Sequence, residues 1–419
     1  MDNRMQWVSA VSRQPSLEAA IEEVSQRVMA ALGSQPDLLL VFIASAFSSE
    51  YSRLMPLLRD RLPAAAMVGC GGSGIVGNLD AAHVEEIEDD SALCVMAARL
   101  PGVKVHTFHL DREDLPDLDG PPQTWIKAIG VEPDAQPCFV VFADPGLVQM
   151  NDLLQGLDYA YPGSVTVGGL ASSDSLREAK QLFADFQAYR SGAVGVALSG
   201  NVAIEPIVAQ GCRPIGQPFW VMECERNIVM QVAMQADSDT IADQGKAQPP
   251  LKALRQIIDQ LNEKDRELAQ YSLFVGLARD AFRQTLEPGD FLIRNLLGVD
   301  PNGGAIAIGD RIRRGQRIQF HLRDADTSAE DLQAVLERYL RDRPEEQPTA
   351  IGALMFACVG RGQGLYSKAN FDSRLLRRYL GALPIAGFFC NGEIGPVGGS
   401  TFIHGYTSVF ALFRPNHPS

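Results

Sequence analysis

The chain lacks the positive charge that nucleic acids and anionic membranes require of a binding surface. Its 419 residues carry a formal net charge of -14, with 51 acidic and 37 basic side chains. Proteins that neutralise phosphates do so with lysine and arginine, and an acidic chain repels such partners. We therefore expect no nucleic-acid partner and interpret the acidic balance as a source of solubility.

The sequence also lacks long apolar runs and a cationic leader. The longest uninterrupted apolar stretch, residues 38–44, is far shorter than the roughly 20 residues that cross a bilayer. No positively charged segment followed by an apolar one opens the chain, so we expect no signal peptide. These absences predict a cytoplasmic protein without membrane insertion.

Cysteine pairs of the kinds that hold zinc or form a disulfide framework are missing. The chain has 7 cysteines, an odd and scattered set without any C-x-x-C spacing. Such a set is typical of reduced thiols inside cells, where a free cysteine packs as a small apolar side chain. The sequence therefore predicts no metal site.

The usual motifs of nucleotide and hydrolytic chemistry are missing or incomplete. The chain holds no G-x-x-x-x-G-K-[ST] loop, no H-E-x-x-H and no G-x-S-x-G elbow. Residues 72–77 match G-x-G-x-x-G after an apolar strand, but residues 78–83 make a poor start for the helix that would hold a pyrophosphate. We therefore expect no cofactor and assign no catalytic residue.

A repeated unit of apolar strand, helix and glycine-ended strand is present three times. The copies cover residues 38–69, 138–169 and 353–387 and align on Phe42, Phe142 and Phe356. Short strands joined by Gly, Pro, Asp and Asn lie between the copies, as in antiparallel hairpins. The pattern predicts a mixed α/β (α+β) fold of β-α-β units with hairpin additions, in which the glycine turns gather at one end of a sheet.

The length of the chain favours two domains rather than one. A polar, proline-ended stretch at residues 237–250 suits a linker or an exposed loop. We therefore predict two related domains of β-α-β units. Their bounds are a helical extension at 1–36, one domain at 37–235, a second at 236–413 and a tail at 414–419.

The strand ends of the third copy carry the densest group of polar side chains. Cys358 and Arg361 follow one strand, and Cys390, Asn391 and Glu393 follow the next. Because neighbouring parallel strands end at the same sheet edge, where open α/β sheets hold ligands, we expect these residues to be neighbours. Arg361 suits a carboxylate and Glu393 an ammonium group, so a zwitterion such as an amino acid would fit. The predicted ligand site also includes the corresponding turns of the first two copies, at Cys70, Gly71 and Gly169.

Two other interpretations of these residues stay open. Arg361 and Glu393 could pair with each other and serve only to shape the turns. Cys390 or Cys358 could instead be the nucleophile of a thiol-dependent enzyme, with His404 as the nearest base in the sequence.

The motifs at residues 357–362, 385–396 and 402–407 resemble the C-terminal half of FIST proteins (F-box and intracellular signal transduction). The glycine turns near Cys70 and Gly169 are similar to the FIST N domain, so the resemblance covers nearly the whole chain. It implies a sensory protein that binds small ligands, amino acids among them, and passes the signal on. Too few residues precede the first strand for an F-box, and nothing resembling a kinase follows, so we expect a separate signalling protein as partner in trans. A pure protein-binding scaffold is the alternative.

Overall fold

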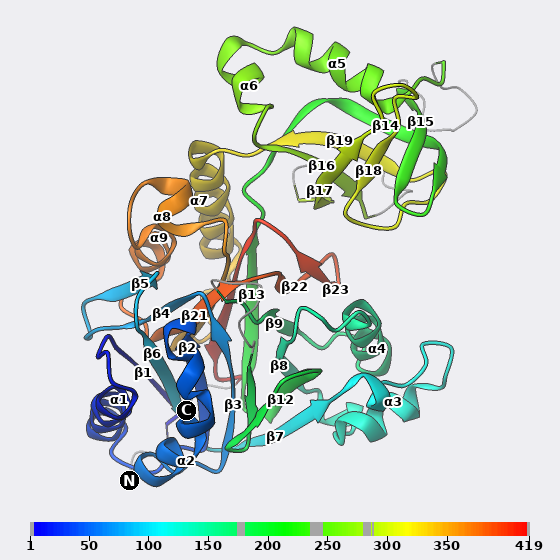
Figure 1. Ribbon diagram of the computed structural model, residues 1–419. Coiled ribbons are helices and arrows are strands. Elements are labelled where there is room, and N and C mark those ends of the chain that lie inside the picture. The colour runs from blue at the N-terminus through cyan, green and yellow to red at the C-terminus, as the bar shows by residue number, and fades with distance from the viewer. Residues whose placement is uncertain (1–3, 174–180, 235–245, 280–285, 287–288, 417–419) are drawn as a thin grey trace. The chain divides into compact units, whose positions relative to one another are not determined.

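The computed structural model describes residues 4–173, 181–234, 246–279, 286 and 289–416. The chain divides into two compact units, one made of residues 1–209 with 333–419 and the other of residues 210–332. Figure 1 shows the elements of both.

The first unit contains three six-stranded sheets with the same strand order. Each sheet runs from an edge strand to an antiparallel neighbour, then to two parallel strands, and ends in a two-stranded hairpin. The first sheet consists of β1 (Gln6–Ser12), β6 (Leu93–Arg99), β2 (Leu38–Ala44), β3 (Ala66–Gly72), β10 (Leu182–Ala184) and β11 (Gln187–Tyr189). The second consists of β7 (Val103–Leu110), β12 (Ala193–Gly200), β8 (Cys138–Ala143), β9 (Thr166–Leu170), β22 (Glu393–Val397) and β23 (Ser400–His404). The third consists of β13 (Ala203–Ala209), β24 (Ser408–Arg414), β20 (Gly352–Cys358), β21 (Ile385–Cys390), β4 (Gly74–Asn78) and β5 (Val84–Glu88).

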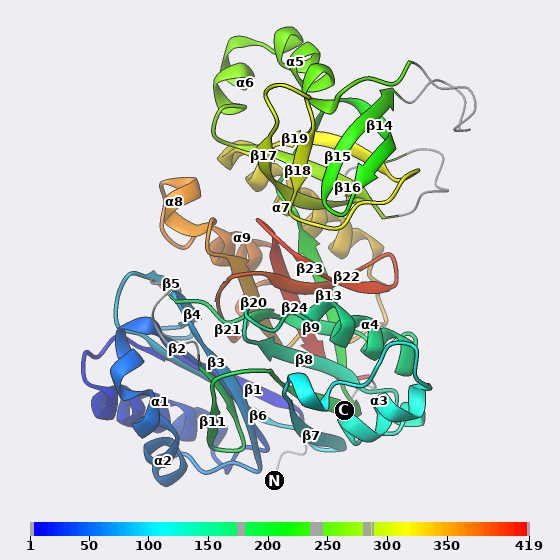
Figure 2. The same ribbon diagram turned by 45° about the vertical axis from the view of Figure 1, so that its right-hand side comes forward.

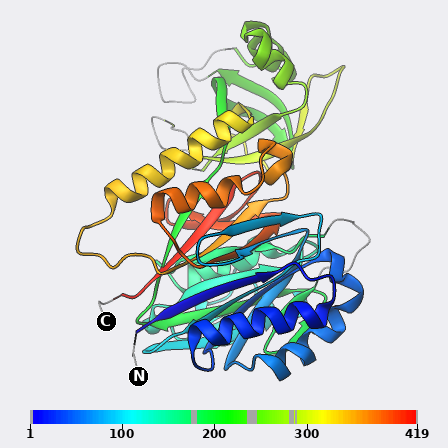
Figure 3. The same ribbon diagram turned by 90° about the vertical axis from the view of Figure 1, so that its left-hand side faces the viewer.

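Helices connect the two parallel strands of each sheet, which confirms the three predicted β-α-β units. The connecting helices are α2 (Tyr51–Arg61), α4 (Met150–Ala160) and the pair α8 (Gly362–Tyr366) and α9 (Phe371–Leu380). A further helix precedes each β-α-β unit in the sequence, namely α1 (Leu17–Leu32), α3 (Pro122–Ile129) and α7 (Ala325–Asp342). Short 3-10 turns lie at η1 (Ser45–Glu50), η2 (Arg112–Asp114) and η3 (Pro133–Ala135). Figure 3 shows α1, in dark blue, running along β1.

Equivalent glycines mark the second parallel strand of each unit. Gly168 pairs with Val141 and Gly387 with Met355, and a Cβ on either glycine would lie 1.8 Å from the carbonyl oxygen of its partner. Gly69 repeats this arrangement against Val41, at 2.0 Å. No side chain fits at such a distance, so each position requires glycine.

The interior of the first unit is one apolar core to which all three sheets contribute. Phe42, Phe142 and Phe356, the residues on which the copies align, are fully buried there together with Phe388. The ring centroids of Phe42 and Phe142 are 5.4 Å apart, and those of Phe142 and Phe356 are 5.9 Å apart. Each such aromatic pair contributes roughly 0.5–1.5 kcal/mol beyond its buried area. Helices α1 and α2 cover the outer face of the first sheet, and α3 and α4 that of the second (Figure 1).

The hairpins are exchanged between sheets in a cycle. The hairpin β4–β5 follows β3 in the chain but pairs with β21 in the third sheet. The hairpin β22–β23 follows β21 but pairs with β9, and β10–β11 follows β9 but pairs with β3. Each β-α-β unit therefore completes the sheet of another unit, which brings the three strand ends together.

The second unit is a closed six-stranded barrel (Figure 2). Its strands, in order around the barrel, are β14 (Arg213–Glu225), β15 (Ile228–Met234), β18 (Ile306–Ile308), β17 (Phe291–Val299), β16 (Leu273–Ala278) and β19 (Arg317–Leu322). Alternate residues such as Val221, Val275 and Phe320 form its core, together with apolar side chains of α5 (Pro250–Gln260). The short helix α6 (Glu263–Leu268) follows α5.

The mixed α/β class predicted from the sequence is confirmed, whereas the compact units have other bounds than the predicted domains. The segment 1–36 contains β1, which pairs with β6 and makes the predicted extension part of the first sheet. Residues 213–234 form the β14–β15 hairpin of the barrel, because β14 also pairs with β19. The predicted linker falls largely on residues 235–245, which lie outside the described part of the chain.

Candidate functional site

The ends of the three β-α-β units meet at Ser73, Ser172 and Asn391, which we call the strand-end centre. Each is the fourth residue after the glycine that contacts the neighbouring strand. The Ser73 N–H donates to Ser172 Oγ at 2.9 Å, and the Ser172 hydroxyl donates to the Phe389 carbonyl. The Asn391 N–H donates to the Leu170 carbonyl at 3.1 Å. Three segments far apart in the sequence are therefore joined by direct hydrogen bonds.

Most of the predicted ligand residues lie around this centre, but few of them reach its surface. A Cβ on Gly169 would lie 2.4 Å from Cys390 Sγ, so these two positions are in direct contact. Of the eight predicted residues, Asn391 alone is exposed, and the others are buried. The Asn391 amide nitrogen lies 3.3 Å from the Ala171 carbonyl, which leaves the amide oxygen to accept from a ligand.

The thiols of Cys390 and Cys70 are poor nucleophiles. Burial raises the pKa of Cys390 well above its ordinary value, and the charge of Glu393 and the neighbouring Cys70 and Cys358 raise it further. Burial alone raises the pKa of Cys70 in the same direction. A thiolate is the reactive form, so the surroundings of Cys390 and Cys70 oppose thiol catalysis.

Gly71 serves the packing of the first unit. Its N–H donates to the Gln181 carbonyl at 2.9 Å, and a Cβ there would lie 3.0 Å from the hydroxyl of Tyr51. That hydroxyl in turn donates to the Ala44 carbonyl at 3.2 Å. The small residue lets the turn approach this tyrosine closely.

Arg361 forms a buried ion pair with a residue that the sequence analysis did not select. Its Nε lies 2.7 Å from Asp372 Oδ2, and its Nη2 lies 3.0 Å from Asp372 Oδ1. The arginine is 1 % exposed and the aspartate fully buried. Arg361 also donates to the Tyr366 hydroxyl and stacks near that ring. A ligand carboxylate would have to displace Asp372 to reach the guanidinium.

Arg361 and Glu393 both hold the turn that precedes β24. Arg361 Nη1 donates to the Tyr406 carbonyl at 3.4 Å, and the Thr407 N–H donates to Glu393 Oε2 at 3.1 Å. Tyr406 has a φ of 64°, a left-handed conformation that the surrounding contacts must maintain. The two residues thus act on one turn, as the turn-shaping interpretation anticipates, although the described ion pair of Arg361 is with Asp372.

A second buried carboxyl, Glu86 on β5, joins the hairpin β4–β5 to α9. Its Oε1 accepts from the Ser373 N–H at 2.7 Å, and its own N–H donates to Asn370 Oδ1 at 2.7 Å. Burial, and then the charge of Asp372, raises the pKa of Glu86 to about 7. The sequence carried no sign of this contact, because Glu86 and Ser373 are brought together only by the exchanged hairpin.

Ser73 and Ser172 were also missed. Ser73 follows Gly69 in the sequence by the same number of residues as Ser172 follows Gly168 and Asn391 follows Gly387. This shared spacing is the signal that identifies the two serines. Comparing positions after the glycine in all three copies, rather than in the third copy alone, would have found the strand-end centre.

The described residues offer no group of three or more His, Cys, Asp and Glu side chains placed to hold a metal ion. None of the helices described is long and apolar enough to cross a membrane. No disulfide joins any of the seven cysteines, all of which are described.

Two protein-family models match the chain. The model of the FIST N domain matches residues 37–234, and the model of the FIST C domain matches residues 250–396. The chain belongs to the FIST family. FIST domains are associated with signal transduction.

Relatives of similar extent include uncharacterized proteins of mycobacteria. One from Mycobacterium bovis is 33% identical over 398 residues, which cover 94% of this chain and 95% of the relative. One from Mycobacterium tuberculosis is 33% identical over 406 residues, which cover 96% and 98%. An F-box/LRR-repeat protein of Arabidopsis thaliana is 21% identical over 466 residues, which cover 98% of this chain and 86% of the relative.

Among solved structures, a cyanuric acid hydrolase from A. caulinodans matches 98% of this chain and 99% of its own chain. The sequence identity is 11% and the TM-score is 0.35, which is too low to carry an inference about this chain.

Proposed function

We propose that this FIST protein is a cytoplasmic sensor that binds a small polar metabolite, an amino acid or a similar compound, at the strand-end centre. The observation that carries the proposal is the meeting of three β-α-β units at Ser73, Ser172 and Asn391. A ligand that contacts Asn391 and the half-buried Ser73 touches the ends of two β-α-β units. The hydroxyl of Ser73 contacts that of Ser172, which connects the ligand to the end of the third unit.

Such a site suits a sensor because the contacted strands belong to different sheets. Asn391 connects β21 of the third sheet with β22 of the second, and Ser73 connects β3 of the first with β4 of the third. A ligand that bound one arrangement of these strand ends more tightly than another would shift the conformational equilibrium of the first compact unit toward that arrangement. The difference in affinity sets the size of the shift. The signal would pass to a separate protein.

In this proposal Arg361 and Glu393 position the site rather than contact the ligand. Arg361 is committed to Asp372, and Glu393 to the Thr407 backbone. Asn391 provides the exposed amide, whose oxygen is left to accept a hydrogen bond from a small ligand.

The test is a thermal-shift screen of the purified full chain against amino acids and related metabolites, followed by calorimetry of any hit. We expect at least one compound to raise the melting temperature of the wild type and of Asn302→Ala, a matched change at an exposed turn of the barrel. Asn391→Ala should lose the response while keeping the melting temperature without ligand. A response that Asn391→Ala retains in full would place the ligand elsewhere.

A further inference from the structure

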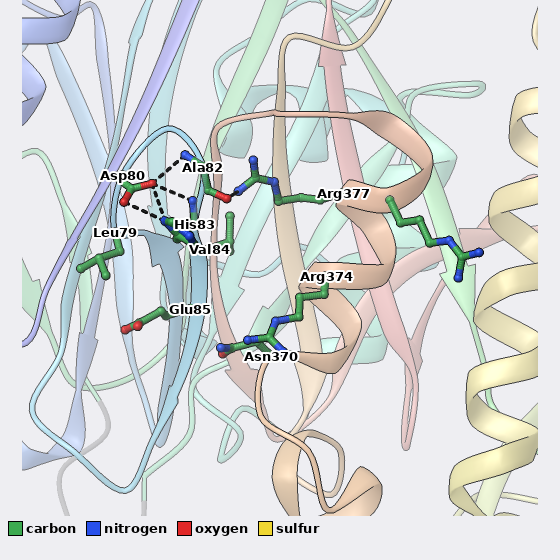
Figure 4. Close-up of a pocket in the computed structure, with 10 residues that line it drawn as sticks. Leu79, Asp80, Ala82, His83, Val84, Glu85, Asn370, Arg374 and Arg377 are labelled. Carbon is green, nitrogen blue, oxygen red and sulfur yellow. Dashed lines mark hydrogen bonds and ion pairs between the residues drawn. The ribbon is translucent and has the colours of Figure 1, made fainter.

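A cleft in the first unit lies apart from the strand-end centre (Figure 4). Its volume is about 650 Å³, and it lies between the β4–β5 turn with the start of β5 (residues 79–85) and helix α9 with the residue before it (residues 370–378). Pockets for small ligands typically measure about 300–1,000 Å³. The cleft is therefore large enough for a metabolite.

Three arginines of α9 line the cleft, although the chain as a whole is acidic. Arg374, Arg377 and Arg378 lie three and four residues apart, so they project from neighbouring positions on the helix. Arg377 donates to the carbonyls of Ala82 and Ala81 at 2.6 and 3.1 Å, and so holds the turn against the helix. Arg374 and Arg378 are exposed, and no hydrogen bond or ion pair of either side chain is found among the described residues. Hydrogen bonds from Gln333 and Tyr379 lower the pKa of Glu337 on α7, and the charge of Arg378 lowers it further.

Two acidic residues, Asp80 and Glu85, also line the cleft. Asp80 accepts from the N–H groups of Ala82 and His83 at 2.6 and 2.8 Å, and its carboxylate also contacts His83 Nδ1. The bond to His83 is the largest of the effects that lower the pKa of Asp80, which keeps it ionised and occupied in the turn. Glu85 Oε2 lies 3.5 Å from Nη1 of Arg13, a residue that does not line the cleft, and it makes no hydrogen bond within the described part of the chain. The three arginines outnumber these two carboxylates, so the net charge of the residues that line the cleft is positive.

Asn370 adds a polar group beside the Arg374 guanidinium. Figure 4 shows the Arg374 side chain extending from α9 toward Asn370 and the strand that carries Glu85. Asn370 has a φ of 61°, and its Oδ1 accepts from the Glu86 N–H, so its amide nitrogen remains as a donor. Asparagine tolerates this left-handed conformation better than most residues, and such conformations cluster at binding sites.

We propose that this cleft binds a small ligand through an oxyanion group, a phosphate ester or a carboxylate, held by Arg374 with the Asn370 amide. A guanidinium donates two parallel hydrogen bonds to either kind of group, and Arg378 adds positive charge nearby. The site is independent of the strand-end centre, since it uses the β4–β5 turn and α9.

Calorimetry on the full chain in a buffer free of phosphate tests the proposal, with inorganic phosphate, glycerol 3-phosphate and succinate as probes. We expect saturable binding of at least one probe, and the comparison of phosphate with succinate identifies the preferred oxyanion. Arg374→Gln should weaken that binding by about tenfold or more, because it removes a charge-assisted bidentate contact.

The matched control is Arg338→Gln, the same loss of charge at an exposed position of α7 outside the cleft. It should change affinity by less than about twofold, since exposed charges at a distance are screened. The proposal is overturned if no probe binds saturably to the wild type. It is equally overturned if Arg374→Gln and Arg338→Gln weaken binding alike, because that result reflects general surface charge.

Discussion

The guanidinium of Arg361 lies in a part of the fold where water cannot solvate it, and Asp372 supplies two hydrogen bonds in its place. Removing one partner of such a pair leaves a buried charge without compensation, which costs far more than the pair contributes. The Ser408 hydroxyl, 3.3 Å from Asp372 Oδ2, could not replace a full positive charge. Arg361 is therefore a structural residue of the third sheet.

We expect Arg361→Ala to lower the free energy of unfolding of the first unit by about 3–5 kcal/mol, because Asp372 is left buried and unpaired. Urea unfolding followed by circular dichroism measures the loss. The combination of Arg361→Met with Asp372→Asn, which removes both charges, should recover a large part of it. Equal losses in the single and the double variant would show that the ion pair is not the cause.

At this scale the sequence predicted which residues gather but not what each one does. Cys70, Gly169, Cys390 and Asn391 were predicted to be neighbours, because strand ends of repeated units share an edge, and they are. The partner of Arg361 was not predictable from a local pattern, since Asp372 looks like any acidic residue in the first turn of a helix. The burial of Arg361 makes its ion pair with Asp372 a structural contact rather than an exposed ligand site. That burial depends on the packing of elements that are distant in the sequence.

The pairing of β20 with β21 requires a residue without a side chain at Gly387. A Cβ at this position would lie 1.8 Å from the Met355 carbonyl oxygen, so the two parallel strands would have to separate. We expect Gly387→Ala to cost about 3 kcal/mol or more, at the upper end of the cost of overpacking. Gly364→Ala in α8, where a Cβ meets nothing within 4 Å, should be neutral or stabilise by up to about 1 kcal/mol. Similar melting temperatures for the two variants would contradict the assigned role of Gly387.

The contact between β5 and α9 should make stability depend on pH. Glu86 has a pKa of about 7 in the folded chain against an ordinary value of 4.5, so between these values the folded state holds a proton that the unfolded state has lost. Stability therefore falls as the pH rises from about 4.5 to about 7, by roughly 3 kcal/mol in total. We expect Glu86→Gln, which resembles the protonated carboxyl, to remove this fall and to stabilise the protein at pH 8.

The control for Glu86 is Glu345→Gln, a matched change at an exposed position. Unfolding midpoints in urea between pH 5 and pH 8 should follow the wild type in this variant. If Glu86→Gln destabilises the protein at pH 8, the ionised carboxylate stabilises the fold, and the assigned cost of its burial is wrong.

Elements with strong local patterns were predictable, and those defined by distant partners were not. The apolar runs and the glycines that end them predict the strands β2, β8 and β20 and the helices that follow each strand. The pairing of β4 with β21 and of β22 with β9 could not be predicted, because a hairpin sequence does not specify which open sheet edge it joins. Strand β1 was missed for the same reason, since its partner β6 lies some 80 residues further along the chain.

The exchange of hairpins decides which parts of the whole chain can fold alone. The first sheet is complete within residues 1–209, but β9 needs β22 and the hairpin β4–β5 needs β21, both supplied by residues 385–397. The barrel strands, by contrast, all lie within residues 213–322 and pair there with one another. The sheets of residues 1–209 thus need strands from residues 333–419, whereas the pairing of the barrel strands needs neither segment.

We expect a fragment of residues 210–332 to unfold cooperatively on heating, and a fragment of residues 1–235 to aggregate or to bind a dye for exposed apolar surface. The second fragment lacks Phe356 and Phe388, so Phe42 and Phe142 lose the partners that cover them. Co-expression of residues 1–209 with residues 333–419 should restore a soluble complex, because together they contain all three sheets. Cooperative unfolding of 1–235 as a monomer would show instead that the boundary predicted at residue 235 separates folding units. In that case the hairpins contributed by the C-terminal segment would be additions to a core that is already stable.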